Sequence, residues 1–285
     1  MLELAINGVV LGGVYAAIAI CIVLMFQTLG TVNFAATTIG GLGAVATILV
    51  MEAGAPPAVS LIAGALAAAA LGAAVGGLML WRFGSADTTT RSTVTIVLLV
   101  GGMALGTRLL GSDAHSFPDA FGGGAVSLPG ISVPVATIVE VVAVLLLAFG
   151  ARAFLRRART GVQLRALSMR PVTARLVGIK VGALTVGVWV FTSVVSALAV
   201  FFVLPTSTFS FATTTTLLIG ALAAALIGML RSLPLAAFGG LALGILQSIS
   251  VTWPMMVNLN QMVPFVVIIV ILLWWRRKDA WSESR

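Results

Sequence analysis

The chain has 285 residues, of which 60% are hydrophobic and only 8% are charged. This is too little charge to cover the surface of a water-soluble domain of that size, so the composition excludes the ordinary soluble classes and predicts a membrane protein. The formal net charge of +8 would suit a nucleic-acid-binding protein, but the basic residues lie in short segments between apolar runs, where membrane insertion places them.

Apolar runs long enough to form membrane-spanning helices recur along the whole sequence. A span needs about 20 apolar residues, and these runs are apolar on every side, which excludes a β-barrel with its alternation of period two. We therefore predict an all-α, polytopic helical membrane protein with about eight or nine transmembrane helices. The second and seventh runs are short enough to be re-entrant or half-spanning. The predicted spans lie near 5–29, 34–51, 59–81, 92–110, 133–151, 181–204, 215–230, 234–252 and 262–275.

The distribution of charge orients these spans. Basic residues concentrate in alternate connections, above all between Arg152 and Lys180, where eight basic residues and no acid occur. Because cytoplasmic loops are enriched in Lys and Arg, we expect the N-terminus outside and the C-terminus in the cytoplasm. Residues 1–285 then form one transmembrane domain, with an irregular outer loop at 111–132 and a basic cytoplasmic loop at 152–180.

The third predicted span carries a small residue at every fourth position, namely Gly64, Ala68, Gly72 and Gly76. Such a helix face lets another backbone approach closely and pack by dispersion. Packing inside the bundle is the favoured interpretation, and an interface with another subunit is the alternative.

One acidic residue, Glu140, falls inside a predicted span, where an ionisable group needs a partner or a watery cavity. Arg108, near the outer end of the fourth span, is a candidate counter-ion. We interpret the two as a structural ion pair, and a role for Glu140 in binding substrate or a proton is the alternative.

The sequence lacks the constellations that enzymes use. No carboxylate pair, histidine–carboxylate set, metal-ligand cluster or phosphate-binding glycine loop occurs at useful spacing. We therefore expect no catalytic residue, no metal and no cofactor in this chain, and no capacity to hydrolyse ATP by itself.

The basic loop has two interpretations. It is an orientation signal that also contacts anionic lipids. From Arg165 to Lys180, however, apolar residues recur among the basic ones, which indicates a short amphipathic helix at the cytoplasmic face. Such a helix would be a natural docking element for a soluble partner.

Several motifs, in order along most of the chain, resemble the LivH-type permease subunits of bacterial ABC importers for branched-chain amino acids. The likeness lies in the opening run 7–19 (NGVVLGGVYAAIA), in 32–35 (VNFA), in 159–161 (RTG), 165–166 (RA) and 176–179 (LVGI), and in 232–234 (SLP) and 239–245 (GGLALGI). The sequence departs from the family pattern at Met169 and Arg170, where an acidic pair is usual, and after Ala35, where Ala36, Thr37 and Thr38 replace histidine, glycine and glutamate.

The resemblance implies one transmembrane half of an importer in the bacterial inner membrane, for a branched-chain amino acid or a related small solute. It also implies four partners: a homologous second permease, two ATPase subunits that bind ATP and Mg²⁺, and an extracytoplasmic solute-binding protein. The alternative is a stand-alone secondary transporter or channel, although these usually keep several ionisable groups in the membrane.

The resemblance places coupling to the ATPases in the segment 161–180. There, Leu167, Leu176 and Ile179 would enter a groove on the ATPase, while Arg165 and Arg175 meet its acidic residues. The candidate coupling residues are Gly161, Arg165, Leu167, Met169, Arg170, Arg175, Leu176, Gly178 and Ile179.

Four polar residues in or beside the first two spans are candidates for lining the translocation pathway. Each has a competing role in helix capping or interhelical hydrogen bonding, which we favour over contact with solute. They are Asn7, Tyr15, Asn33 and Thr37.

Overall fold

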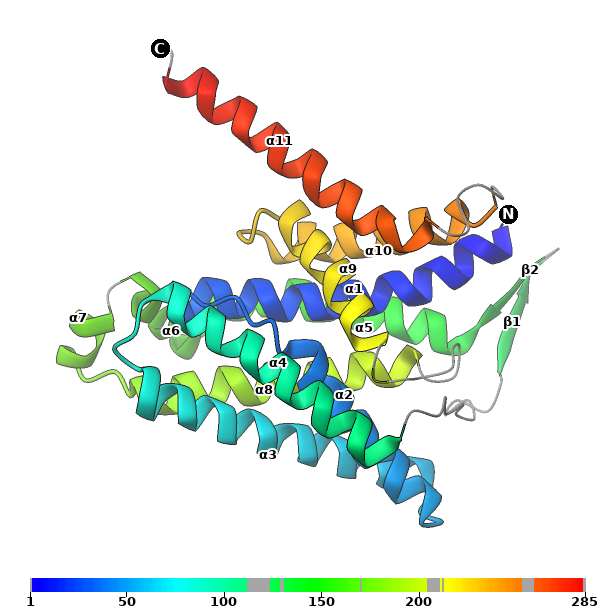
Figure 1. Ribbon diagram of the computed structural model, residues 1–285, viewed down its shortest axis with the longest axis horizontal. Helices are drawn as coiled ribbons and strands as arrows, with labels where there is room; N and C mark the ends of the chain where they lie inside the picture. Colours follow the sequence, from blue (N-terminus) through cyan, green and yellow to red (C-terminus); the bar gives the residue numbers. More distant parts are fainter. Residues whose placement is uncertain are drawn as a thin grey trace.

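The computed structural model describes residues 2–111, 124–128, 131–169, 171–203, 211, 213–252 and 259–283. Apart from one hairpin, the regular elements among the described residues are helices, and each predicted span corresponds to one of them (Figure 1). The elements are α1 (Leu2–Leu29), α2 (Ala36–Glu52), α3 (Pro57–Phe83), α4 (Thr88–Leu110), β1 (Ala125–Leu128), β2 (Ile131–Pro134), α5 (Val135–Arg157), α6 (Arg159–Met169), α7 (Pro171–Leu176), α8 (Val181–Val203), α9 (Thr213–Ile227), α10 (Leu233–Ser250), the 3-10 turn η1 (Asn260–Met262) and α11 (Val263–Glu283).

The helices differ in their capacity to cross a membrane. Within the described ranges, six are long and apolar enough by length and composition, namely α1, α3, α4, α5, α8 and α10. The apolar parts of α2, α9 and α11 are shorter. The prediction of a polytopic helical membrane protein is therefore confirmed, and the short second and seventh spans are indeed the short helices α2 and α9.

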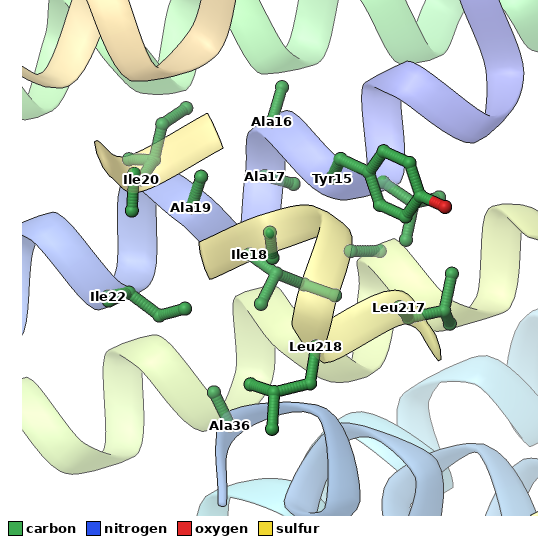
Figure 2. Close-up of a cluster of buried hydrophobic side chains, with 14 of the residues drawn as sticks. Tyr15, Ala16, Ala17, Ile18, Ala19, Ile20, Ile22, Ala36, Leu217 and Leu218 are labelled. Carbon is green, nitrogen blue, oxygen red and sulfur yellow. The ribbon is translucent and has the colours of Figure 1, made fainter. Parts of the chain in front are cut away.

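Helix α1 lies at the centre of the bundle. Its residues from Val14 to Met25 are almost completely buried, and it contacts α5, α8, α9 and α10. Figure 2 shows side chains of this stretch packed with Leu217 and Leu218 of α9 and Ala36 of α2. The outer helices α3, α4 and α5 instead expose many large apolar side chains, as expected for surfaces that meet lipid or another membrane protein.

A close helix contact joins α1 to α10 through glycines on both sides. A Cβ at Gly12 would lie 2.8 Å from the Cα of Leu241, and a Cβ at Gly240 would lie 2.5 Å from the backbone nitrogen of Ala16. A Cβ at Gly244 would collide with the backbone of Gly12 and with the carbonyl oxygen of Gly8. The two backbones therefore touch, and only residues without a side chain permit this separation.

The small-residue face of α3 packs inside the bundle. A Cβ at Gly64 would meet Thr47 and the carbonyl oxygen of Gly43 on α2, and one at Gly72 would lie 2.8 Å from the carbonyl oxygen of Trp189 on α8. The favoured interpretation of this face is confirmed, because α2 and α8 already occupy it.

The two ends of the bundle carry different elements (Figure 1). The N-terminus and the β-hairpin lie at one end, while α6, α7 and the C-terminus lie towards the other. The hairpin pairs Val126 with Val133 and Ser127 with Ser132. It corrects the expectation that the outer loop 111–132 is irregular throughout; residues 112–123 and 129–130 of that loop fall outside the described residues.

The connection from α3 to α4 is held by local polar contacts. Asp87 caps the start of α4 by accepting hydrogen bonds from the amide and the hydroxyl of Thr90. The Thr90 hydroxyl bond lowers the pKa of the Asp87 carboxyl below its ordinary value. Arg91 closes the turn by donating to the carbonyl oxygens of Phe83 and Gly84.

We predict that Gly244→Ala destabilises the protein by about 1–3 kcal/mol, because the added methyl group forces the α1 and α10 backbones apart. Gly187→Ala on α8 is the matched control, since a Cβ there meets nothing within 4 Å. Replacing a helical glycine with alanine in open space should stabilise by roughly 0.5–1 kcal/mol. Thermal unfolding of both purified variants in detergent measures the difference, and equal effects would contradict the close contact.

Candidate functional site

The candidate coupling segment forms two short helices rather than one. Helix α6 ends at Met169 and α7 begins at Pro171. Proline lacks an amide hydrogen and suits the first position of a helix, so it favours a new start there. Gly178 follows α7 with φ of +82°, a left-handed conformation that glycine adopts readily. The amide of Ile179 then donates to the carbonyl oxygen of Ala174 at 3.1 Å, which closes the helix end.

One side of this segment anchors it to the bundle. Leu164 and Leu167 of α6 and Ala174 of α7 are buried. Leu167 and Ala174 cluster with Val181, and the partly buried Leu29 and Ile179 pack against them. Gly161 is also buried. A Cβ there would collide with the carbonyl oxygen of Phe154 at the end of α5, so α6 packs closely on that helix end.

This arrangement corrects the role expected for one apolar coupling candidate. Leu167 is buried against the bundle, so it is not free to enter a groove on a partner, whereas Ile179 is only partly buried there. The sequence pattern showed an apolar stripe, but it did not show that α1 and α8 already cover part of it.

The other side of the segment is exposed. Met169 is 82% exposed and Leu176 is 83% exposed, and the Arg165 side chain is also exposed. Two large apolar side chains and one guanidinium group thus project from short helices at one end of the molecule. Arg170 and the side chain of Arg175 fall outside the described residues.

Tyr15 pairs with a residue from the far end of the chain. Its buried hydroxyl donates to the Oε1 atom of Gln247 at 2.8 Å, which joins α1 to α10. The competing structural role foreseen for Tyr15 is therefore the one observed. We did not identify Gln247 from the sequence, although an amide within an apolar span needs a hydrogen-bond partner and was a usable signal.

Two other pathway candidates differ in their bonding. Asn33 is buried, and its Oδ1 atom accepts from the amide of Ala35 at 3.0 Å, so its side chain supports the turn before α2. Thr37, by contrast, is buried with a hydroxyl that has no partner among the described residues. Asn7, near the start of α1, is exposed.

Thr37 is one of several buried hydroxyls on α2 and α8 that lack partners. Thr38 and Ser193 share this property within the described ranges, whereas Ser196 lies beside the Cys21 thiol. The two helices are in contact, and a Cβ at Gly40 of α2 would lie 2.7 Å from the carbonyl oxygen of Ser196. The serines were missed in the sequence because single hydroxyls in apolar spans are common.

The expected ion pair between Arg108 and Glu140 is not formed. Glu140 is buried against α1, where a Cβ at Gly13 would lie 2.5 Å from its Oε1 atom. Neither carboxyl oxygen has a hydrogen-bond partner among the described residues. Arg108 is exposed in the last turn of α4, and α4 and α5 are not neighbouring helices.

Glu140 instead borders a small apolar pocket of about 170 Å³ between α1, α5 and α8. Its lining includes Ala17, Val144, Leu198 and Phe202. The carboxyl is the one acidic group in this lining. In the described part of the chain, no three His, Cys, Asp or Glu side chains lie together as metal ligands would.

Comparison with known proteins adds a family and a fold. Residues 4–272 match the model of a family described as "Branched-chain amino acid transport system / permease component". No curated protein matches the chain. Among solved structures, the chain is similar to PsaBC from Streptococcus pneumoniae in complex with Fab, with a TM-score of 0.52 and 15% identity over 95% of this chain and 88% of that chain. At this identity the likeness is one of fold.

We predict that a double-mutant cycle of Arg108→Gln and Glu140→Gln gives an interaction energy within about 0.5 kcal/mol of zero, as expected for residues that do not touch. The Tyr15→Phe and Gln247→Leu cycle is the positive control, and it should give about 0.6 kcal/mol or more because those side chains share a buried hydrogen bond. Unfolding free energies of the six variants in detergent provide the measurement. A coupling of 1–2 kcal/mol between Arg108 and Glu140 would restore the ion pair.

Proposed function

The chain belongs to the family of branched-chain amino acid transport permease components, and from this premise we propose that it is one transmembrane half of an ABC importer. A permease component is non-catalytic, so ATP and Mg²⁺ would be bound by two partner ATPase subunits. We place the complex in the bacterial inner membrane, with the N-terminus outside and the solute a branched-chain amino acid or a related small compound.

The observation that supports this proposal best is the two-sided character of the α6–α7 segment. Its inner side is fixed to the bundle by Leu164, Leu167 and Ala174. Its outer side exposes the apolar side chains of Met169 and Leu176. Exposed apolar surface of this kind is typical of a site that binds another protein. An ATPase subunit that docks there would contact a helical segment fixed to the bundle rather than a flexible loop.

The contacts of the segment offer a route for its movement into the bundle. Helix α6 packs on α1, α5 and α8, and α7 packs on α6 and α8. A displacement of α6 and α7 would therefore reach the central helix directly. Two-state rocking of the bundle between outward and inward access would follow from ATP-driven closure of the ATPases.

The charge of the segment suits an acidic partner surface. Arg165 is exposed on α6, and Arg175 lies on the following helix. We propose that they meet acidic residues of the ATPase, a complementarity that fixes the register of docking more than its strength. The second permease would cover exposed apolar faces of the outer helices, and a solute-binding protein would dock at the end that carries the β-hairpin.

The buried hydroxyls on α2 and α8 are the better candidates for the polar part of the pathway. The polar groups of Tyr15 and Asn33 already bond within the chain. Thr37 and Ser193 keep unpartnered hydroxyls, and Ser193 lies on the helix that packs against α2. We propose that these two groups contact the solute or its water when the bundle opens.

We predict that Leu176→Asp, alone or with Arg165→Glu, lowers co-purification of the ATPase subunits and solute uptake by at least tenfold. A loss of this size corresponds to about 1.4 kcal/mol of docking free energy. Thermal stability of the permease should change by less than about 0.5 kcal/mol, since both side chains are exposed.

Arg82→Glu is the matched control for charge, because Arg82 is exposed in the last turn of α3 and lies outside the segment. It should retain ATPase binding. Uptake by reconstituted protein that needs no ATP and is insensitive to the α6–α7 variants would instead favour the stand-alone transporter.

A further inference from the structure

A basic pocket lies where α1, α5, α6 and the turn before α10 meet. Its volume is about 250 Å³. The guanidinium-bearing residues Arg152 and Arg156 come from α5, Arg165 from α6 and Arg231 from the α9–α10 turn. The remaining lining consists of Gln27, Leu155, Ser232, Leu233 and Pro234. We call this set the arginine pocket.

The arginine pocket has positive charge without compensation. No acidic residue is in its lining. Among the described residues, none of its four guanidinium groups takes part in a hydrogen bond or ion pair. Like charges that converge on one cavity repel one another. An anion bound between them would replace this repulsion with attraction.

The floor of the pocket is apolar and belongs to the helix bundle. Leu155, Leu233 and Pro234 are buried, whereas the four arginines are exposed. An anion held here would therefore sit at the end of the helices rather than in open solvent. The planar, forked guanidinium group matches a phosphate better than a point charge does, because it can donate two parallel hydrogen bonds.

Apolar side chains continue from the pocket along both long helices that line it. On α5, Phe149 and Leu146 are exposed within two turns of Arg152. On α10, Leu235 and Phe238 are exposed just beyond Ser232. These residues run towards the middle of each helix, away from the charged end. A charged pocket that continues into apolar helix faces matches the form of a phospholipid.

We propose that the arginine pocket binds the phosphate of an anionic membrane lipid whose acyl chains lie along α5 and α10. Basic pockets between transmembrane helices are typical sites for anionic headgroups. Binding of a lipid does not require that the chain couple to an ATPase. The pocket shares Arg165 with the surface proposed to meet the ATPase, so the test uses Arg152 and Arg231, which lie outside that surface.

The lipid would connect two parts of the chain that are remote in sequence. Its phosphate would join the end of α5 to α6 and to the turn between α9 and α10. Because α6 is part of the proposed coupling segment, an occupied pocket would also restrain that segment against the bundle.

The test uses the purified, delipidated full-length chain and native mass spectrometry with added phosphatidylglycerol. We expect Arg152→Gln with Arg231→Gln to weaken phosphatidylglycerol binding by about 25-fold, since each basic side chain at an anionic surface contributes about a fivefold factor. Arg231→Gln alone should weaken phosphatidylglycerol binding about fivefold. Because Arg231 lies in a turn, this single variant tests the pocket even if the double variant does not fold.

Arg82→Gln with Arg159→Gln is the control, because it removes the same charge from exposed residues outside the pocket. Phosphatidylcholine and glycerol phosphate complete the comparison, and both should bind at least tenfold more weakly than phosphatidylglycerol. Equal binding of the two lipids, or equal losses in the pocket and control variants, would overturn the proposal. Glycerol phosphate binding as tightly as the lipid would assign the pocket to a soluble anion. Loss of ATPase co-purification with lipid binding unchanged would assign it to a partner's acidic residues.

Discussion

The contact between the backbones of α1 and α10 is the constraint on which the rest of the bundle depends. It joins the first long helix to one near the other end of the chain, and it encloses Tyr15 and Gln247 in a hydrogen bond. In lipid there is little hydrophobic drive between helices, so close dispersion contact and buried hydrogen bonds must supply the cohesion. The remaining helices pack around the pair, and α1 becomes the buried axis of the molecule.

The sequence predicted the helices well because long apolar runs have few alternatives in a membrane. The close packing of α3 was also predictable, since small residues repeated along one face. The predictions that failed were those that depend on which helices are neighbours in the bundle. Glu140 and Arg108 were paired because a buried carboxyl needs a counter-charge, but the carboxyl faces α1 rather than α4.

In the candidate coupling segment, too, the sequence did not show which side chains face neighbouring helices. Its apolar stripe was visible, and so was Pro171, yet the inward and outward sides of the stripe could not be told apart. Burial of Leu167 and exposure of Leu176 are set by the positions of α1 and α8. Residues brought together from distant parts of the chain, as in the arginine pocket, have no signature in local spacing.

The central position of α1 has a consequence for biosynthesis. Tyr15 and Gln247 are 232 residues apart, and a ribosome adding 5–20 residues per second needs roughly 10–50 s to synthesise that interval. During this time the glycine face of α1 has no final partner. Either the translocon and lipids cover that face, or a helix synthesised before α10 packs against it first and is later displaced by α10.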